Sequence, residues 1–394
     1  MGIFYYIYYI LQMRASVLIG ATQMNNRMNN SYIEINTEML GENIRSLSAH
    51  LNGAMLIPVL KDNAYGLGLT EIARFLLTFD EIGPLAVSHV SEAEQLRNAG
   101  ILSDILVISS ALPFQLEYAV ANGITLACSR PEMCFELSEI SKRLGKRARI
   151  QIKINTGLNR IGFLPGKELD DFISSFMAVK DHIAIDGVFS HFQSASSYES
   201  CKSQYDLFLS GISQLEAAGL NLPMKHISSS ASFELFPEFN MDAVRLGRAM
   251  YMDHPLQPAG MVREIASWRS YVCTISHRSA GTVLGYGGYM TLDKDSDVAV
   301  IGVGYGDGLD PALADVHAPV LINGVRCPLL VCSMDQSLVD ITGVKCSVGD
   351  EVTLYGYDAM GNLLSSQAQA LLIGSDEGCG LTSKLSDRVS RIYK

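Results

Sequence analysis

The sequence predicts an α/β fold in which a (β/α)8 barrel of the TIM type is followed by a mostly β C-terminal domain. Two patterns predict this fold class. From residue 31 short apolar segments alternate with helical periodicity, and beyond about residue 255 short strands follow, separated by Gly, Asp and Asn turns. The length of 394 residues also favours two domains over one. In such a barrel we expect the active site at the carboxyl ends of the strands.

The barrel strands are predicted from apolar runs that suit a parallel sheet buried on both faces. The eight runs are 32–36, 54–60, 85–88, 105–108, 124–127, 149–154, 186–192 and 224–227. Helical periodicity lies between several of them, at 38–51, 70–77, 92–98, 114–121, 170–176 and 203–218. A doubly wound open sheet is the alternative. Its usual GxGxxG nucleotide fingerprint does not open a helix after an early strand in this sequence.

The β domain is predicted from short apolar strands that turn residues separate. These strands lie at 271–275, 298–301, 319–322, 329–331 and 351–354. The proline-bracketed segment 255–258 marks the predicted junction. The predicted organisation is an N-terminal extension at 1–30, disordered or packed at an interface, a barrel at 31–255 and a β domain at 256–394.

Composition narrows the function classes. A net charge of −11 without a basic run argues against nucleic acid and anionic membranes as partners. The eight cysteines are scattered, with no CxxC pair and no zinc-like spacing, so we expect reduced thiols, no metal and a cytoplasmic location. The apolar segment 3–11 is too short to span a membrane and lacks the basic start of a signal peptide.

One lysine stands out because the apolar run 54–60 delivers it to the end of a predicted strand. Burying an ammonium group is costly, so Lys61 needs a reason to be there. A structural reason is that it snorkels to water or pairs with Asp62. A functional reason is that a desolvated amine forms a Schiff base with a carbonyl cofactor.

The segment 59–68, VLKDNAYGLG, resembles the pyridoxal-phosphate lysine motif of alanine racemases. That motif usually has Ala in place of Asp62 and His in place of Leu67. The resemblance extends over about 31–393, with further motifs in the family's order. It implies a pyridoxal 5'-phosphate (PLP)-dependent enzyme of fold type III that interconverts L- and D-alanine by a two-base mechanism. The product would supply D-alanine for peptidoglycan.

The resemblance also implies how the cofactor is held. Arg245 matches the arginine that faces the pyridine nitrogen. Since an arginine stays protonated and cannot accept a proton, that nitrogen would remain unprotonated, which weakens the electron sink. Tyr65, Ser230 and the backbone amides near Gly247 and Arg248 would bind the phosphate. Taken without the resemblance, an ion-paired arginine and a serine-rich turn are ordinary structural features.

Racemisation needs two bases, because Cα must be protonated from either face. Lys61 would serve one face, and Tyr286, in GYGGY, matches the family's tyrosine base for the other. Free tyrosine has a pKa of about 10, so it needs positive charge or hydrogen bonds nearby. His191 matches the histidine placed between that tyrosine and the pyridine arginine. In the family the tyrosine reaches into the neighbouring subunit, which implies a homodimer with shared sites.

Substrate contacts follow from three further segments. Lys153 and Arg160 match a segment in which many relatives carry a carbamylated lysine that orients an arginine toward the substrate carboxylate. Met334 and Asp335 match the loop whose backbone meets that carboxylate, and Tyr305 resembles the tyrosine at the entrance. The glycines beside Tyr305 would equally suit a plain turn.

Two departures from the family pattern leave alternatives open. Asn155 stands where the family usually has Asp. Asp387 stands where some alanine racemases have a tyrosine beside substrate and cofactor, so a racemase of serine or another small amino acid is the first alternative. A fold-related decarboxylase and a non-catalytic PLP-binding relative are the others. The decarboxylase should carry a cysteine-centred acidic motif, for which the segment around Cys379 is a poor match.

Overall fold

The computed structural model describes residues 29–195, 197–252, 260–375 and 378–394. The chain forms two compact units, a barrel unit, Thr37–Glu264, and a β unit, which joins the segment up to Asn36 to Ile265–Lys394. The predicted junction at 255–258 and residues 1–28 of the predicted extension lie outside the described residues. Within the described ranges no helix is both long and apolar enough to cross a membrane.

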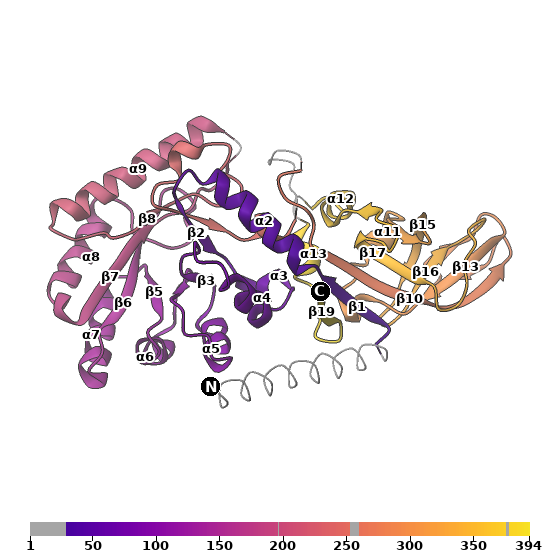
Figure 1. Ribbon diagram of the computed structural model, residues 1–394, viewed down its shortest axis with the longest axis horizontal. Helices are drawn as coiled ribbons and strands as arrows, with labels where there is room; N and C mark the ends of the chain where they lie inside the picture. Colours follow the sequence, from indigo (N-terminus) through magenta and orange to yellow (C-terminus); the bar gives the residue numbers. More distant parts are fainter. Residues whose placement is uncertain (1–28, 196, 253–259, 376–377) are drawn as a thin grey trace, which may run out of the picture. The chain divides into compact units, whose positions relative to one another are not determined.

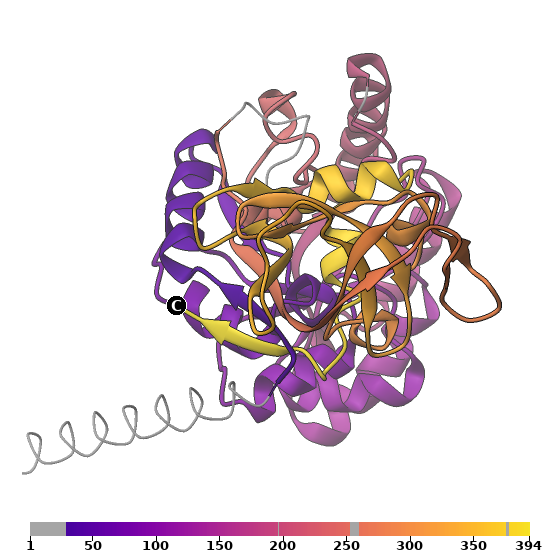
Figure 2. The ribbon, with the colours of Figure 1, turned by 90° about the vertical axis from the view of Figure 1, so that its right-hand side faces the viewer.

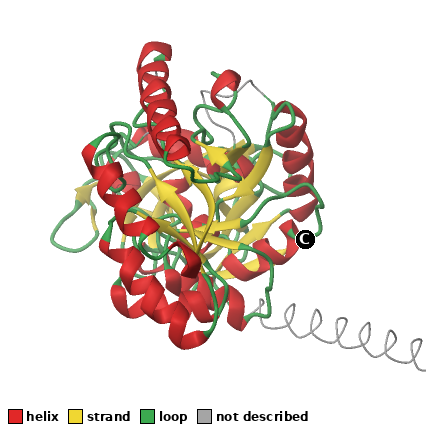
Figure 3. Cartoon of the chain, turned by 90° about the vertical axis from the view of Figure 1, so that its left-hand side faces the viewer, coloured by secondary structure: helices red, strands yellow, loops and turns green. Residues whose placement is uncertain are grey.

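Eight parallel strands build the barrel unit, as the fold class predicts. The strands β3 to β8 pair in chain order, and β2 pairs with β9. Isolated bridges from Val59 to Ala86 and from Ser229 to Arg245 connect the two groups, so the ring of strands closes inside a layer of helices (Figure 3). The strands are β2 (Met55–Pro58), β3 (Leu85–Val87), β4 (Ile105–Val107), β5 (Thr125–Cys128), β6 (Ala148–Lys153), β7 (Ile183–Phe189), β8 (Lys225–His226) and β9 (Ala243–Leu246).

The helices of this unit bury one apolar face each. In α2 (Thr37–His50) the buried face carries Leu40, Ile44 and Leu47, as the periodicity predicts. The others are α3 (Lys61–Tyr65), α4 (Leu69–Leu76), α5 (Val90–Asn98), α6 (Pro113–Ala121), α7 (Glu132–Leu144), α8 (Lys167–Met177), η1 (Lys180–His182), α9 (Tyr198–Ala217), η2 (Pro237–Phe239) and α10 (Arg248–Tyr251).

One helix, α7, is absent from the sequence prediction. Its buried face includes Ser138 and Ser141 beside Met133, Cys134 and Leu137. Two buried serines interrupt the apolar stripe, and the helical period is therefore hard to recognise in the sequence.

The first predicted barrel strand belongs to the other unit, which corrects the predicted boundary. The strand β1 (Ser31–Ile35) pairs antiparallel with β10 (Ala266–Arg278) and parallel with β19 (Ser390–Tyr393). Its side chains alternate between buried and half-buried, the pattern of a strand with one wet face, whereas barrel strands such as β3 are buried throughout. The missing barrel strand is β9, whose buried Arg245 disguises an otherwise apolar run.

The β unit is built on one large sheet, as predicted for a mostly β domain (Figures 1 and 2). Its strand order is β18-β17-β14-β15-β16-β13-β10-β1-β19, and an additional pairing of β17 with β10 closes part of the sheet on itself. Further elements are β11 (Val283–Leu284), β12 (Met290–Thr291), β13 (Ser296–Ile301), η3 (Tyr305–Asp307), α11 (Ala312–Asp315), β14 (Pro319–Ile322), β15 (Val325–Cys332), β16 (Ser337–Asp340), β17 (Glu351–Tyr357), β18 (Leu363–Leu364), α12 (Ser366–Leu372) and α13 (Cys379–Thr382).

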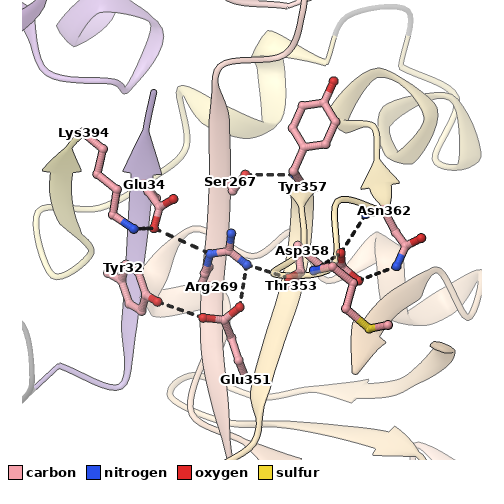
Figure 4. Close-up of polar contacts among 11 residues, drawn as sticks. Tyr32, Glu34, Ser267, Arg269, Glu351, Thr353, Tyr357, Asp358, Asn362 and Lys394 are labelled. Carbon is pink, nitrogen blue, oxygen red and sulfur yellow. Dashed lines mark hydrogen bonds and ion pairs between the residues drawn. The ribbon is translucent and has the colours of Figure 1, made fainter. Parts of the chain in front are cut away.

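A chain of charges ties β1, β10, β17 and β19 together (Figure 4). The buried Arg269 on β10 donates to Glu351 at 2.6 Å and lies 4.0 Å from Glu34. Lys394 pairs with Glu34 at 2.6 Å, and the Tyr32 hydroxyl donates to Glu351 at 3.0 Å. Burial first, and then Tyr271 and Glu351, raise the pKa of Tyr32, which keeps its proton for this bond.

Candidate active site

The carboxyl ends of the barrel strands carry the candidate residues of this unit, as predicted. Lys61 follows β2, Lys153 ends β6 and His191 follows β7. Ser230 follows β8, and Arg245 lies in β9. Because parallel barrel strands end at one rim, these five side chains gather at the same end of the barrel.

The strand before Lys61 is buried, but Lys61 itself is exposed. The Val59 amide donates to the Leu246 carbonyl and the Leu60 amide to the Ala86 carbonyl, both at 2.7 Å. This corrects the expectation of a desolvated amine, because the buried run ends at Leu60. Lys61 is thus an exposed residue at the end of a fixed strand, and its amine lies 5.7 Å from the centre of the Tyr65 ring.

The backbone after Lys61 turns in the left-handed sense. Residues 62–65 have φ between 53° and 57°, and Gly66 follows with φ 85°. A left-handed turn costs residues other than glycine about 1–2 kcal/mol each, although Asp and Asn tolerate it better than most. Asp62, where the family usually has Ala, and Asn63 therefore suit this turn.

Three predicted phosphate-binding residues lie together beside this turn. The Tyr65 phenol packs on the backbone of Gly247, where an added Cβ would come within 2.0 Å of Tyr65 Oη. Ser230 Oγ accepts the amides of Gly247 at 3.2 Å and Ala249 at 3.4 Å. The side chain of Arg248, which begins α10, is buried. Glycine at 247 thus leaves a cradle of amides and hydroxyls at the rim.

Arg245 is buried and pairs with no carboxylate of the residues that the structure describes: its acceptors there are ring nitrogens and carbonyl oxygens. One terminal nitrogen lies 2.7 Å from His226 Nδ1. The other donates to the Ser190 carbonyl at 2.7 Å and to His191 Nδ1 at 3.0 Å. Burial lowers the pKa of Arg245 to about 9, so it remains charged at neutral pH.

These contacts fix the tautomers of two histidines. A guanidinium group only donates, so Nδ1 of His191 and of His226 must accept, and each proton lies on Nε2. His226 Nε2 then donates to Gln151 Oε1 at 2.7 Å. Burial first, and the Arg245 charge second, hold the pKa of both histidines well below its usual value. His226 and Gln151 were missed from the sequence, where they read as ordinary strand residues.

Lys153 is a buried amine with no carboxylate partner among the described residues. Its Nζ donates to the Ile154 carbonyl at 3.2 Å and to Ser190 Oγ at 3.4 Å. Burial first, then the charges of Arg245 and Arg160, hold the pKa of Lys153 well below its usual value. The site therefore favours the neutral form of the amine more than water does.

Arg160 lies on an exposed loop that Asn155 shapes. Asn155 Oδ1 accepts the amides of Gly157 and Asn159, both at 3.1 Å. An aspartate, which the family usually has here, could accept the same two bonds. The positive charge of Arg160 reaches Lys153, whose pKa it helps to lower.

The β unit brings four other candidates together around an open hollow of about 1340 Å³. Tyr286, Tyr305, Met334 and Asp335 all line it. Tyr286 lies between β11 and β12 and is 92% exposed. Arg388, which the sequence analysis missed, also lines the hollow and pairs with Asp335 at 2.7 Å. Its place beside Asp387 in a family-like segment was the available signal.

Backbone contacts join the Tyr305 turn to the Met334 loop. The Tyr305 amide donates to the Ser333 carbonyl and the Gly306 amide to the Met334 carbonyl, both at 2.9 Å. A Cβ on Gly304 would come within 2.1 Å of the Ser333 oxygen. The glycines beside Tyr305 therefore permit a close approach of two loops, beyond the plain turn considered from the sequence.

Asp387 does not join this group. It is exposed and is not among the described residues that line the hollow, although Arg388 is. The structure gives no support to Asp387 as part of the hollow in this unit.

A parallel barrel with reactive side chains at the carboxyl ends of its strands, linked to a β domain that presents exposed tyrosines, defines a two-domain enzyme. Residues 35–255 match the family model for the alanine racemase N-terminal domain, and 265–393 match that for the C-terminal domain. The chain belongs to the alanine racemase family.

Relatives support the same assignment over nearly the whole chain. The alanine racemase of Clostridium tetani is 30% identical over 371 residues, 92% of this chain and 95% of the relative. That of Methanococcus maripaludis is 31% identical, over 92% of this chain and 98% of the relative. Among solved structures, the alanine racemase of a D-cycloserine-producing Streptomyces lavendulae superposes with a TM-score of 0.87 at 27% identity, over 93% of this chain and 97% of that one.

Proposed function

We propose that this protein is an isomerase that interconverts L- and D-alanine with PLP as cofactor and with Lys61 and Tyr286 as its two bases. Alanine as substrate rests on relatives named alanine racemase that are 30% and 31% identical over 92% of the chain. The single structural observation that carries the rest is the barrel rim, where an open amine, a cradle of donors and a buried cation lie together.

The rim residues fit PLP. The Ser230 and Tyr65 hydroxyls and the backbone amides near Gly247 and Arg248 are groups that would bind a phosphate dianion, the Gly247 and Ala249 amides exchanging their bonds to Ser230 Oγ for it. A side chain at 247 would fill the space beside Tyr65. Arg245 would face the pyridine nitrogen as a donor. When bound, PLP supplies an electron sink that makes the α-proton of an amino acid acidic.

The chain's own residues would move the protons. Lys61 Nζ, at the exposed end of a fixed strand, would take or return the α-proton on one face. Tyr286 Oη would serve the other face. Since Arg245 stays protonated and cannot accept a proton, a ring nitrogen facing it would remain unprotonated, which would limit charge withdrawal and favour rapid reprotonation at Cα. His191, with its proton on Nε2, offers a donor that would stabilise the phenolate form of Tyr286.

We propose a homodimer in which Tyr286 completes the site of a second copy. Its 92% exposure, at a tip between two short strands, suits a side chain that acts outside its own unit. Mixing Lys61→Ala protein with Tyr286→Phe protein tests the sharing of sites. Heterodimers with one intact site should recover activity that neither parent has, and a verified heterodimer without activity would contradict it.

We also propose that Lys153 is carbamylated. Its neutral amine would attack CO2, form a C–N bond and release one proton, leaving a carbamate anion. That negative charge would lie near Arg160 and Arg245, both of which act electrostatically on the amine. The carbamate would orient Arg160 toward the substrate carboxylate, with the Met334–Asp335 loop and Tyr305 completing the substrate contacts.

The setting of the activity forms part of the same proposal. All eight cysteines are free thiols, in keeping with a reducing compartment such as the cytoplasm. D-Alanine would enter peptidoglycan precursors there.

Incubation of the PLP-loaded protein with L-alanine or L-serine in deuterated water tests the function. Rapid D-alanine with deuterium at Cα is the expected result. Dominant D-serine would move the substrate assignment to serine. Exchange with retention of configuration would mean that only one base works, and no exchange with either substrate would refute the proposed activity.

A further inference from the structure

We propose that Glu92 is a positioning residue for Lys61. Its carboxylate joins two segments: the left-handed turn that follows Lys61 and the start of α5. The proposal rests on the proposed role of Lys61 and adds a residue that holds it in place.

Glu92 accepts three backbone amides from two parts of the barrel rim. Oε2 accepts the amides of Ser88 at 2.8 Å and His89 at 3.0 Å, which caps its own helix. Oε1 accepts the amide of Asp62 at 2.5 Å. The last bond crosses 30 residues of sequence and is not needed to cap α5. Glu92 is half-buried as a residue; its bond to Ser88 is partly buried, whereas its bonds to Asp62 and His89 are exposed.

The amide of Asp62 belongs to the first peptide plane after Lys61. Because a peptide is planar, holding that N–H also fixes the Lys61 carbonyl and with it the backbone direction at Lys61. The far end of the turn is held in a similar way, since Asn63 Oδ1 accepts the Leu69 amide at 2.8 Å. A strained turn with an anchor near each end fixes the backbone at Lys61 and thus the direction in which its side chain leaves the chain.

A carboxylate is the group that this position needs. Both of its oxygens accept, so it can face Asp62 on one side and Ser88 with His89 on the other. A glutamine of the same shape has one acceptor and one NH2 donor. It would turn a donor toward a backbone N–H on one of the two sides.

The first test is hydrogen exchange of the Asp62 amide in the intact protein, which does not depend on activity. In Glu92→Ala both acceptors are lost, and we expect exchange at least ~10-fold faster than in the wild type. Glu92→Gln should reduce the exchange protection of the Asp62 amide, or that of the Ser88 and His89 amides, with little change in melting temperature. Unchanged protection of Asp62 in the alanine variant would overturn the proposal.

The second test asks whether the bond matters for the amine. We expect Glu92→Ala to lower kcat by on the order of 10-fold to 100-fold, with the KM for L-alanine within about twofold, and to slow borohydride labelling of Lys61 by PLP. Glu94→Gln, on the same helix and exposed, is the matched control and should behave as the wild type. Wild-type kcat and labelling in a folded Glu92→Ala protein would show a purely structural cap and overturn the proposal.

The two tests separate this proposal from the function on which it rests. If borohydride labels another lysine of the wild-type protein, the proposed role of Lys61 is wrong and Glu92 positions no catalytic amine. If Lys61 is labelled but the Glu92 variants leave the protection of the Asp62 amide unchanged, the proposed role of Glu92 is wrong and that of Lys61 stands.

Discussion

Tyr65 lies against Gly247 so closely that a Cβ on Gly247 would come within 2.0 Å of Tyr65 Oη and 2.7 Å of the ring carbon that bears it. The φ of Gly247 is −119°, so space, rather than a left-handed backbone, requires glycine at this position.

Gly247→Ala should therefore displace Tyr65 and weaken PLP binding, with an increase in the Kd of on the order of 10-fold or more. Titration of the protein with PLP, monitored by the absorbance of the cofactor, measures this Kd. Gly41→Ala in α2, where an added Cβ meets nothing nearer than 3.5 Å, is the control and should leave the Kd unchanged. An unchanged Kd for Gly247→Ala would refute the cradle.

Acid should destabilise the barrel unit through its buried histidines. The folded-state pKa of His191 and of His226 lies below the unfolded value, so the unfolded chain binds more protons. Their contribution to stability is thus present above about pH 6.5 and is lost as pH falls toward the folded pKa. Urea unfolding at several pH values from about 5 to about 8, the range in which histidine titrates, measures this loss of stability. In a folded His226→Gln protein the slope should be shallower, and an identical slope would contradict this explanation.

Lys153→Met should make the protein more stable and less active. Burial disfavours the charged amine, so stability from this group rises with pH up to its unfolded pKa, and at pH 7 the amine is a cost. In protein kept free of CO2, so that the amine is unmodified, replacing it with an apolar chain should raise the free energy of unfolding. Racemase activity should fall, and a carbamate carbon signal seen with labelled bicarbonate should disappear. The same signal in the variant would exclude Lys153 as its source.

Arg269→Met should destabilise the β unit, because it leaves the Glu351 and Glu34 carboxylates without their buried cation. Removing one partner of a buried ion pair costs about 3–5 kcal/mol. The matched control is Lys167→Met, which breaks a fully exposed pair with Asp171 and should cost much less. Denaturant unfolding followed by the fluorescence of Trp268, which lies in the same strand, compares the two. Equal losses of unfolding free energy in the two variants would mean that the ion pairs of Arg269 do not stabilise the β unit more than an exposed pair does.

The sequence predicted the order of the elements well, because apolar runs and helical periods repeat regularly through the barrel. It failed where polar groups are buried: the serines of α7 hid a helix, and Arg245 hid the strand β9. It also placed β1 in the wrong unit, since alternation identifies a strand but not its partners.

Lys61 was predictable because it follows an apolar run, whereas the other candidates at the strand ends were predicted from the resemblance to alanine racemases. The contacts of Glu92, His226 and Arg388 were not, because each joins segments far apart in the chain. The exposure of Lys61 was also missed, since the buried run ends one residue before it.

The pairing of β1 with β19 has a consequence for synthesis. Ile35 accepts the amide of Lys394, so residues near opposite ends of the described chain share one sheet, with the whole barrel unit inserted between β1 and β10. Chains fold from the N-terminus as they leave the ribosome. The barrel can therefore form once residue 264 has emerged. The strand β1, made first, cannot pair with β19 until residues 390–393 have been synthesised.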